Sequence, residues 1–262
     1  MIPRPDYISP DGDIALYHGD AMQVLSQLPS ARLTASGGFS AIITDAPYSS
    51  GGAFRGDRML STRDKYVQSG QREAQADFTG DNRDQRSFRY WCDLWLSHCR
   101  RVSRPGAPVC LFSDWRQLPI TTDAMQSAGY VWRGVAVWDK GPSARPQMGR
   151  YKSQAEYIVW GSNGPMPQDT TVGVLPGVFT FPIRKSDKHH QVGKPSELME
   201  QVCRICPPDG TILDPFAGSG STAIGAIRQG RAFVGIELDE HYFRVAVERI
   251  NRELGIGQRE AA

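Results

Sequence analysis

The sequence predicts a single α/β domain over residues 1–262, built on a twisted, mostly parallel sheet with helices on both faces. Short apolar runs alternate with amphipathic stretches along the whole chain, and the last third forms a compact strand–helix–strand–helix unit. Hydrophobic residues make up 40% of the chain, which favours a packed globule over a disordered one.

The expected elements follow from hydrophobic periodicity and from the residues that end each run. Strands are expected at 14–17, 41–44, 109–112, 131–138, 157–160, 211–213 and 233–236, and helices at 22–28, 87–102, 117–127, 195–206, 221–229 and 242–254. The strand at 157–160 is expected to run antiparallel to the rest. Phe88, Trp91 and Trp95 lie at helical spacing, which predicts that they face the core.

Two segments lack this periodicity. Residues 49–85 are rich in Gly, Ser, Arg, Asp and Gln, and too few of them are apolar to form a core. We therefore expect an inserted mobile loop there. Residues 161–188 contain four prolines and are expected to be irregular as well.

Composition limits the function only loosely. The formal charge of +2 and the pI of about 8.3 neither demand nor exclude nucleic acid, because a local basic face matters more than the sum. No apolar run is long enough to span a membrane, and the N-terminus lacks the apolar core of a signal peptide, so a cytoplasmic protein is expected. The odd count of five cysteines then indicates reduced thiols. Cys203 and Cys206 form an isolated C-x-x-C, which favours core packing over zinc, and no metal is expected.

A glycine-containing loop, Asp214–Thr222, follows one expected strand and opens a helix. Its glycines let the backbone approach a ligand closely, and Glu237 ends the next strand, where ribose hydroxyls are expected. The spacing by itself leaves a nicotinamide cofactor or simple strand–helix packing open. Similarly, Asp45-Ala46-Pro47-Tyr48 follows the strand at 41–44, where Asp45 could merely cap a turn that Pro47 forms.

Together these motifs carry a resemblance. Asp-Pro-Phe-Ala-Gly-Ser-Gly-Ser-Thr at 214–222 resembles the S-adenosyl-L-methionine loop of DNA amino-methyltransferases, and Asp45–Tyr48 resembles their catalytic tetrad, usually Asp-Pro-Pro-Tyr. The tetrad precedes the cofactor loop, and this circularly permuted order is the mark of the β group of these enzymes. The resemblance implies a Rossmann-like methyltransferase fold and a site-specific DNA methyltransferase.

The resemblance also implies a cofactor site. Gly19-Asp20-Ala21 resembles the segment that contacts the adenine of the cofactor, and residues 190–195 resemble the segment that flanks its methionine. The implied cofactor-binding residues are Asp20, Ala21, Asp45, Lys194, Pro195, Asp214, Phe216, Ala217, Gly218, Ser219, Gly220, Ser221, Thr222, Glu237 and Leu238. Trp160-Gly161 resembles the end of the antiparallel strand that precedes a target-recognition region, here 161–188.

The tetrad suits transfer of a methyl group to an exocyclic amino nitrogen, whose lone pair is delocalised into the ring. Asp45 Oδ and the carbonyl of Ala46 can accept its two hydrogens, and Tyr48 offers a flat face to a base that has left the duplex. Pro47 fixes the turn. Direct in-line displacement needs no metal and no covalent intermediate, so positioning and electrostatics carry the rate. Ala46 replaces the usual first proline but retains the carbonyl.

Adenine N6 is the expected target, because adenine enzymes of the group usually have Asp in the first tetrad position and cytosine-N4 enzymes Ser. Cytosine N4 is the alternative; an RNA or protein methyltransferase and a non-catalytic DNA-binding regulator are further ones. Double-stranded DNA is the expected partner, and a homodimer is possible. The predicted DNA-facing residues are Arg55, Arg58, Arg145, Arg150, Lys152, Arg184, Lys185 and Lys188, with Lys140 as a further candidate.

Overall fold

The computed structural model describes residues 3–34, 37–48, 83–142, 148–182 and 193–256. Within them, one nine-stranded sheet runs in the order β1-β2-β9-β8-β3-β4-β6-β5-β7. Its strands are β1 (Tyr7–Ile8), β2 (Ile14–His18), β3 (Ala41–Thr44), β4 (Pro108–Ser113), β5 (Val131–Asp139), β6 (Ala155–Ser162), β7 (Val178–Thr180), β8 (Thr211–Asp214) and β9 (Ala232–Glu237). Most neighbouring strands are parallel, and β6 is antiparallel to both of its neighbours.

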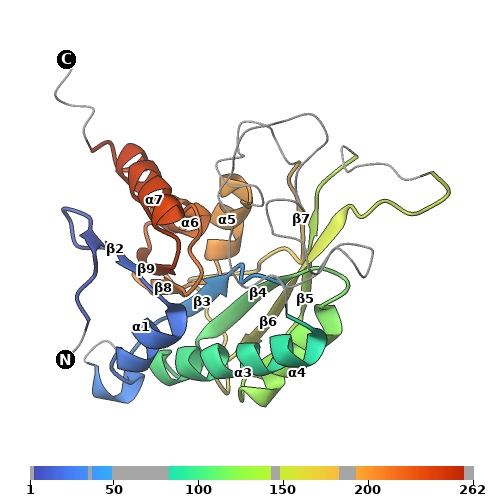
Figure 1. Ribbon diagram of the computed structural model, residues 1–262, viewed down its shortest axis with the longest axis horizontal. Coiled ribbons are helices and arrows are strands. Elements are labelled where there is room, and N and C mark those ends of the chain that lie inside the picture. Colours follow the sequence, from blue (N-terminus) through green and yellow to red (C-terminus); the bar gives the residue numbers. More distant parts are fainter. Residues whose placement is uncertain (1–2, 35–36, 49–82, 143–147, 183–192, 257–262) are drawn as a thin grey trace.

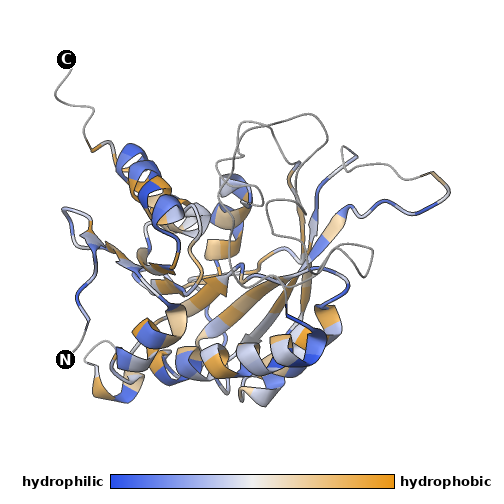
Figure 2. Ribbon diagram, viewed as in Figure 1, coloured by the Kyte–Doolittle hydropathy of each residue, from blue (hydrophilic) through white to orange (hydrophobic). Residues whose placement is uncertain are grey.

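Helices cover both faces of this sheet (Figure 1). They are α1 (Ala21–Gln27), α3 (Gln85–Val102), α4 (Leu118–Ser127), α5 (Ser196–Cys203), α6 (Ser221–Arg228) and α7 (Glu240–Glu253), with a short 3-10 helix at Ala31–Leu33. One buried cluster packs α1, α3 and α4 against the sheet, and the other packs α5, α6 and α7 against the opposite face. In Figure 2 the hydrophobic sides of these helices accordingly turn toward the strands.

Aspartates begin three of the helices, which explains where those helices start. The side chain of Asp84 accepts from the backbone N–H groups of Arg86 and Ser87 at the start of α3. Asp20 and Asp239 cap α1 and α7 in the same way. Each cap satisfies backbone donors that have no partner inside the helix.

The α/β class, the mostly parallel sheet and the antiparallel strand β6 are confirmed. Two short strands were not expected: β1 is antiparallel to β2, and β7 lies inside the segment 161–188 and pairs with β5. Both are too short to show a period of two residues. The helix expected at 195–206 ends earlier, at Cys203. Most of the segment 49–85 lies outside the described residues.

The helix α3 carries the aromatic face expected from its spacing. Phe88 and Trp95 are buried, and Trp91 is half-buried against them. In the described residues, no helix is long and apolar enough to cross a membrane.

Gly225 shows how closely the helices of one layer approach. A Cβ built on it would lie 2.6 Å from the carbonyl carbon of Met199 in α5. We therefore expect Gly225→Ala to lower the free energy of unfolding by about 1–3 kcal/mol through overpacking, although the same change in an exposed helix stabilises it. Urea denaturation measures the difference. Gly177→Ala is the control, since a Cβ there meets nothing within 4 Å; equal losses in both variants would contradict the prediction.

Candidate active site

The two aspartates singled out by the sequence follow neighbouring strands. β3 and β8 pair in parallel, so Asp45 and Asp214 both lie at the carboxyl edge of the sheet. Thr44 Oγ1 donates to Asp214 Oδ1 at 2.6 Å and joins the two strand ends across 170 residues of sequence. The carboxyl edge of an open α/β sheet is where such folds bind ligands.

Asp214 holds the glycine-containing loop in place. Its Oδ2 accepts from Thr222 Oγ1 at 2.6 Å, and its Oδ1 also accepts from the backbone N–H of Phe216 at 3.0 Å. The carboxyl group is buried, and this burial raises its pKa to about 6, against the opposing effect of these hydrogen bonds. Asp214 therefore closes the loop by contacting both its beginning and the first turn of α6.

The surroundings of the loop's two glycines, Gly218 and Gly220, differ. Both have positive φ, +53° at Gly218 and +81° at Gly220. A Cβ on Gly220 would lie 3.1 Å from the Cβ of Ala246, so the packing of α7 restricts that position. A Cβ on Gly218 would meet no atom of the described residues within 4 Å.

Glu237 ends β9 and faces this loop. Its Oε2 accepts from the N–H of Gly218 and its Oε1 from the N–H of Asp239, both at 2.8 Å. Burial raises the pKa of this carboxyl to about 7. The predicted adenine-contacting segment lies beside it, because the N–H of Gly19 donates to the carbonyl of Glu237 at 2.8 Å. Asp20 and Ala21 follow directly, and Leu238 is 53% exposed.

Some of the predicted cofactor residues use their side chains to support the loop. Arg249 of α7 donates to the carbonyl and hydroxyl oxygens of Ser219 and to Ser221 Oγ. The ring of Phe216 packs against Trp91 and Trp95, with centroids 5.2 and 5.1 Å apart. Ala217 is buried. These residues stay predicted cofactor contacts. The backbone N–H groups of Phe216 and Ala217 already donate within the protein, to Asp214 Oδ1 and to the carbonyl of Ile236.

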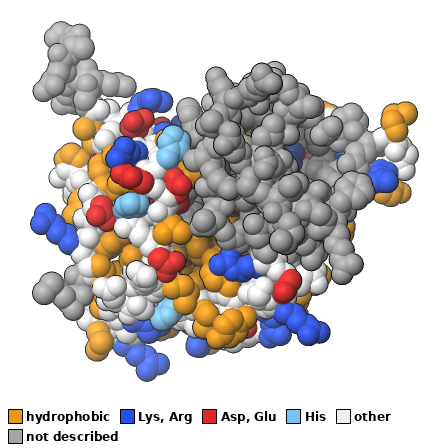
Figure 3. Space-filling view, in the orientation of Figure 1, with side chains coloured by type: hydrophobic (Ala, Val, Ile, Leu, Met, Phe, Trp, Pro, Cys, Tyr) orange, Lys and Arg blue, Asp and Glu red, His pale blue; other side chains and the backbone are white. Residues whose placement is uncertain are grey.

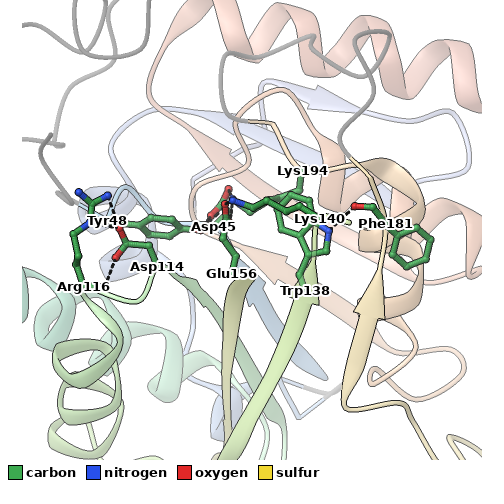
Figure 4. A network of polar contacts seen from close by, with 9 residues as sticks. All are labelled: Asp45, Tyr48, Asp114, Arg116, Trp138, Lys140, Glu156, Phe181 and Lys194. Atoms are coloured by element: carbon green, nitrogen blue, oxygen red, sulfur yellow. Dashed lines mark hydrogen bonds and ion pairs between the residues drawn. The ribbon is translucent and has the colours of Figure 1, made fainter. Parts of the chain in front are cut away.

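The tetrad is tied to Lys194 (Figure 4). Lys194 Nζ lies 2.6 Å from Asp45 Oδ2 and donates to the Tyr48 hydroxyl at 3.0 Å. The Tyr48 hydroxyl in turn donates to Asp45 Oδ1. Ala46 is buried and Pro47 half-buried between them. Asp45 thus has a fixed orientation, and its two oxygens retain lone pairs for further donors.

Lys194 is 6% exposed and lies among aromatic rings. Its Nζ is 5.2 Å from the ring centroid of Phe112, 5.3 Å from that of Tyr48 and 5.9 Å from that of Trp138. The resemblance places Lys194 beside the methionine of the cofactor; the structure brings it to Asp45. Pro195 precedes α5 as its N-cap residue.

Sequence reasoning missed a second carboxylate in this network. Glu156 of β6 has its Oε2 at 3.2 Å from Lys194 Nζ, an ion pair without hydrogen-bond geometry. Its Oε1 lies 2.5 Å from Lys140 Nζ. Lys140, a further candidate for facing DNA, thus pairs with a nearly buried carboxylate, and its contact with DNA stays a prediction. The available signal was one acidic residue within an otherwise largely apolar strand.

Burial and charge act against each other in the network. Burial raises the pKa of Asp45, Lys194 opposes this rise and Glu156 adds to it. Burial also opposes ionisation of Glu156, but the ammonium groups of Lys194 and Lys140 outweigh it and lower the pKa. Burial would lower the pKa of Lys194, yet the two carboxylates raise it. The lysine and Glu156 therefore remain charged.

Most predicted DNA-facing residues cannot be placed. Arg55, Arg58, Arg145, Arg184, Lys185 and Lys188 lie outside the described residues. Arg150 and Lys152 are exposed, and Lys152 Nζ donates to the carbonyl of Pro142 at 3.0 Å. On the face shown in Figure 3, the described Lys and Arg side chains are interspersed with Asp, Glu and hydrophobic ones rather than gathered in one patch.

The five cysteines are buried. Cys203 and Cys206 belong to the core cluster beneath α5, as predicted, and burial raises the pKa of the Cys206 thiol to about 12. Such thiols pack as small hydrophobic groups.

The sheet is mostly parallel, β6 runs antiparallel to its neighbours, and β9 ends in Glu237 beside the glycine-containing loop. This arrangement is the Rossmann-like methyltransferase fold. The chain belongs to the DNA methylase family of N6 and N4 type, whose sequence model matches residues 39–174 and 178–248. It is thus a DNA methyltransferase.

Individual relatives agree with this family. The chain is 25% identical to the type II methyltransferase M.ScaI of Streptomyces caespitosus, over 92% of the chain and 82% of that protein. It is 26% identical to the putative methylase YubD of Escherichia coli (strain K12), over 88% of each.

Solved structures share the fold at lower identity. The complex of M1.HpyAVI with SAM has a TM-score of 0.65 and 23% identity, covering 91% of this chain and 99% of the other. The cytosine-N4-specific PvuII DNA methyltransferase has a TM-score of 0.68 and 16% identity, covering 96% and 94%.

The hydrogen bonds of Asp214 generate a test of the loop. In Thr222→Val, Asp214 Oδ2 loses its hydroxyl donor in a buried site, and we expect the free energy of unfolding to fall by about 1–3 kcal/mol. Thr222→Ser keeps the donor and serves as the control. Chemical denaturation of the three proteins measures this, and a valine variant as stable as the serine variant would argue against the anchoring role.

Proposed function

We propose that this chain transfers the methyl group of S-adenosyl-L-methionine to N6 of adenine in double-stranded DNA, by direct in-line displacement on a flipped base. The observation that carries the proposal is the position of the Asp45 carboxylate. It lies at the carboxyl edge of β3, next to the glycine loop after β8, and Thr44 bonds the two together. An acceptor for an amino group and a cofactor loop are thus neighbours.

The loop fits the proposed cofactor on two observations. Among the described residues no atom lies within 4 Å of a Cβ built on Gly218, and the carboxylate of Glu237 lies at the end of the next strand with an acceptor pair suited to ribose hydroxyls. Gly218–Gly220, Glu237 and the segment at Asp20 would hold it, with Leu238 exposed beside them. When bound, the cofactor supplies an electrophilic methyl group on a sulfonium.

The tetrad supplies the groups that the amino nitrogen needs. Asp45 and the Ala46 carbonyl accept its two hydrogens, which returns electron density to the nitrogen. Tyr48 presents its ring to the extruded base, while its hydroxyl and Lys194 hold Asp45 in orientation. Arg150 and Lys152, both exposed, join the basic residues proposed to contact phosphate.

The choice of adenine rests on Asp45 as the first residue of the tetrad, where cytosine-N4 enzymes of this group usually have Ser. A cytosine-N4 enzyme shares the fold, so cytosine N4 is the competing target. The fold, the cofactor loop and the acceptor pair are common to both reactions.

Gly218 provides a test of the cofactor site. Gly218→Ala adds a methyl group on the side of the loop where we expect the cofactor. We expect the affinity for S-adenosyl-L-methionine to fall about tenfold or more, because a clash between this methyl group and the cofactor that costs about 1.4 kcal/mol lowers affinity tenfold. Gly230→Ala is the matched control, because Gly230 also has a positive φ, +62°, and open space around it. Calorimetric titration compares them; equal affinity in both would refute the assignment of the loop.

Asp45 provides a test of the chemistry and of the target base. Because Asp45→Ala loses one preorganised polar group, we expect this variant to turn over about 10²–10³-fold more slowly than the wild type at saturating cofactor. Nucleoside analysis of methylated DNA should detect N6-methyladenine. N4-methylcytosine in its place would overturn the adenine assignment, and full activity of Asp45→Ala would remove the tetrad from the mechanism.

A further inference from the structure

Four charged side chains form an alternating row from β5 to β3. Lys140 follows β5, Glu156 lies on β6, Lys194 precedes α5 and Asp45 follows β3. Consecutive charged atoms are 2.5, 3.2 and 2.6 Å apart, and all four side chains are at most 23% exposed. Figure 4 shows the row running into the hydroxyl of Tyr48.

Lys194 alone would make Asp45 a poor acceptor. An ammonium at 2.6 Å in a mostly buried site attracts the electron density that the amino group of a base needs. A second carboxylate on the same ammonium weakens this effect, because Lys194 then divides its charge between two partners. Glu156 is that second carboxylate, and Lys140 holds it in the charged form.

We propose that Glu156 is a positioning residue for methyl transfer: it holds the ammonium of Lys194 between two carboxylates, so that Lys194 orients Asp45 without neutralising it. This inference rests on the proposed function, in which Asp45 binds the amino group of the base. Glu156 touches neither Asp45 nor the base in this role, and it acts only through Lys194.

The charges around Asp45 give the sign of the effect. Lys194, Glu156 and Tyr48 face Asp45, and Asp214 lies on the neighbouring strand. Asp114, after β4, acts on Tyr48. Asp45 must be ionised to accept, so activity falls as the pH falls through its pKa. Loss of the Glu156 charge lowers that pKa and moves the acidic limb of kcat to lower pH; loss of the Lys194 charge moves it to higher pH.

The test is the pH profile of kcat for DNA methylation by the full-length protein. We expect Glu156→Gln to shift the acidic limb to lower pH and to lower the plateau of kcat by about tenfold or more, the usual effect of removing an outer partner of a reacting group. KM for DNA and the affinity for S-adenosyl-L-methionine should stay unchanged. Lys194→Met should shift the acidic limb the opposite way.

Two further variants keep the test decisive. Glu253→Gln removes a half-buried carboxylate that pairs with Arg228 far from the site, and should retain the wild-type profile. If Glu156→Gln does not fold, Lys140→Gln serves instead. This variant leaves Glu156 bound to Lys194 alone, and we expect it to move the acidic limb of kcat to higher pH. A wild-type profile in the folded variant, or shifts of both Glu156→Gln and Lys194→Met in one direction, would overturn the inference. Failure of the proposed role of Asp45 is distinguishable, because Asp45→Ala would then be fully active, whereas the inference holds for either target base.

Discussion

The buried ammonium group of Lys194 is the constraint around which the active-site edge is organised. Removing an ammonium from water costs several kcal/mol unless opposite charges and hydrogen bonds compensate it. Asp45 after β3 and Glu156 from β6 supply that compensation, and the rings of Tyr48, Phe112 and Trp138 lie near the ammonium group. Three segments distant in sequence are therefore held in one arrangement by a single charge.

The order of the sheet makes this arrangement useful. β8 and β3 are adjacent and parallel, so the loop after β8 and the tetrad after β3 meet although they are far apart in the chain. The hydrogen bond from Thr44 to Asp214 fixes the distance between them. Asp214 also binds the beginning and end of the loop, so the same carboxylate positions both halves of the site.

The alanine in the tetrad fits this view of the site. Ala46 stands where the relatives of this group usually have proline, and its side chain is buried in the cluster beneath α3. A proline ring would restrict the backbone there, but the ion pair of Asp45 and the hydrogen bonds of Tyr48 already do so. The carbonyl of residue 46 stays the proposed second acceptor, since the backbone rather than the side chain provides it.

The sequence by itself determined the class of fold, nearly all strands and helices, and the two motifs that the structure brings together at the carboxyl edge of the sheet. These features are local: apolar periodicity, glycines and a tetrad can be recognised within a few residues of sequence. It also predicted the burial of Trp95 and Cys203 from spacing alone. The short strands β1 and β7 escaped it because they exist only through pairing with β2 and β5.

Only the tertiary structure decided the partners of the charged groups. From the sequence, Lys140 was a candidate for facing DNA and Lys194 belonged to a segment expected to flank the cofactor. Glu156 was given no role. Their pairing depends on β5, β6 and α5 meeting at one edge of the sheet, which no local pattern encodes. Electrostatic interactions in a buried site act through space over a few ångströms, and so residues far apart in the sequence, Lys194 and Glu156, shift the pKa of Asp45.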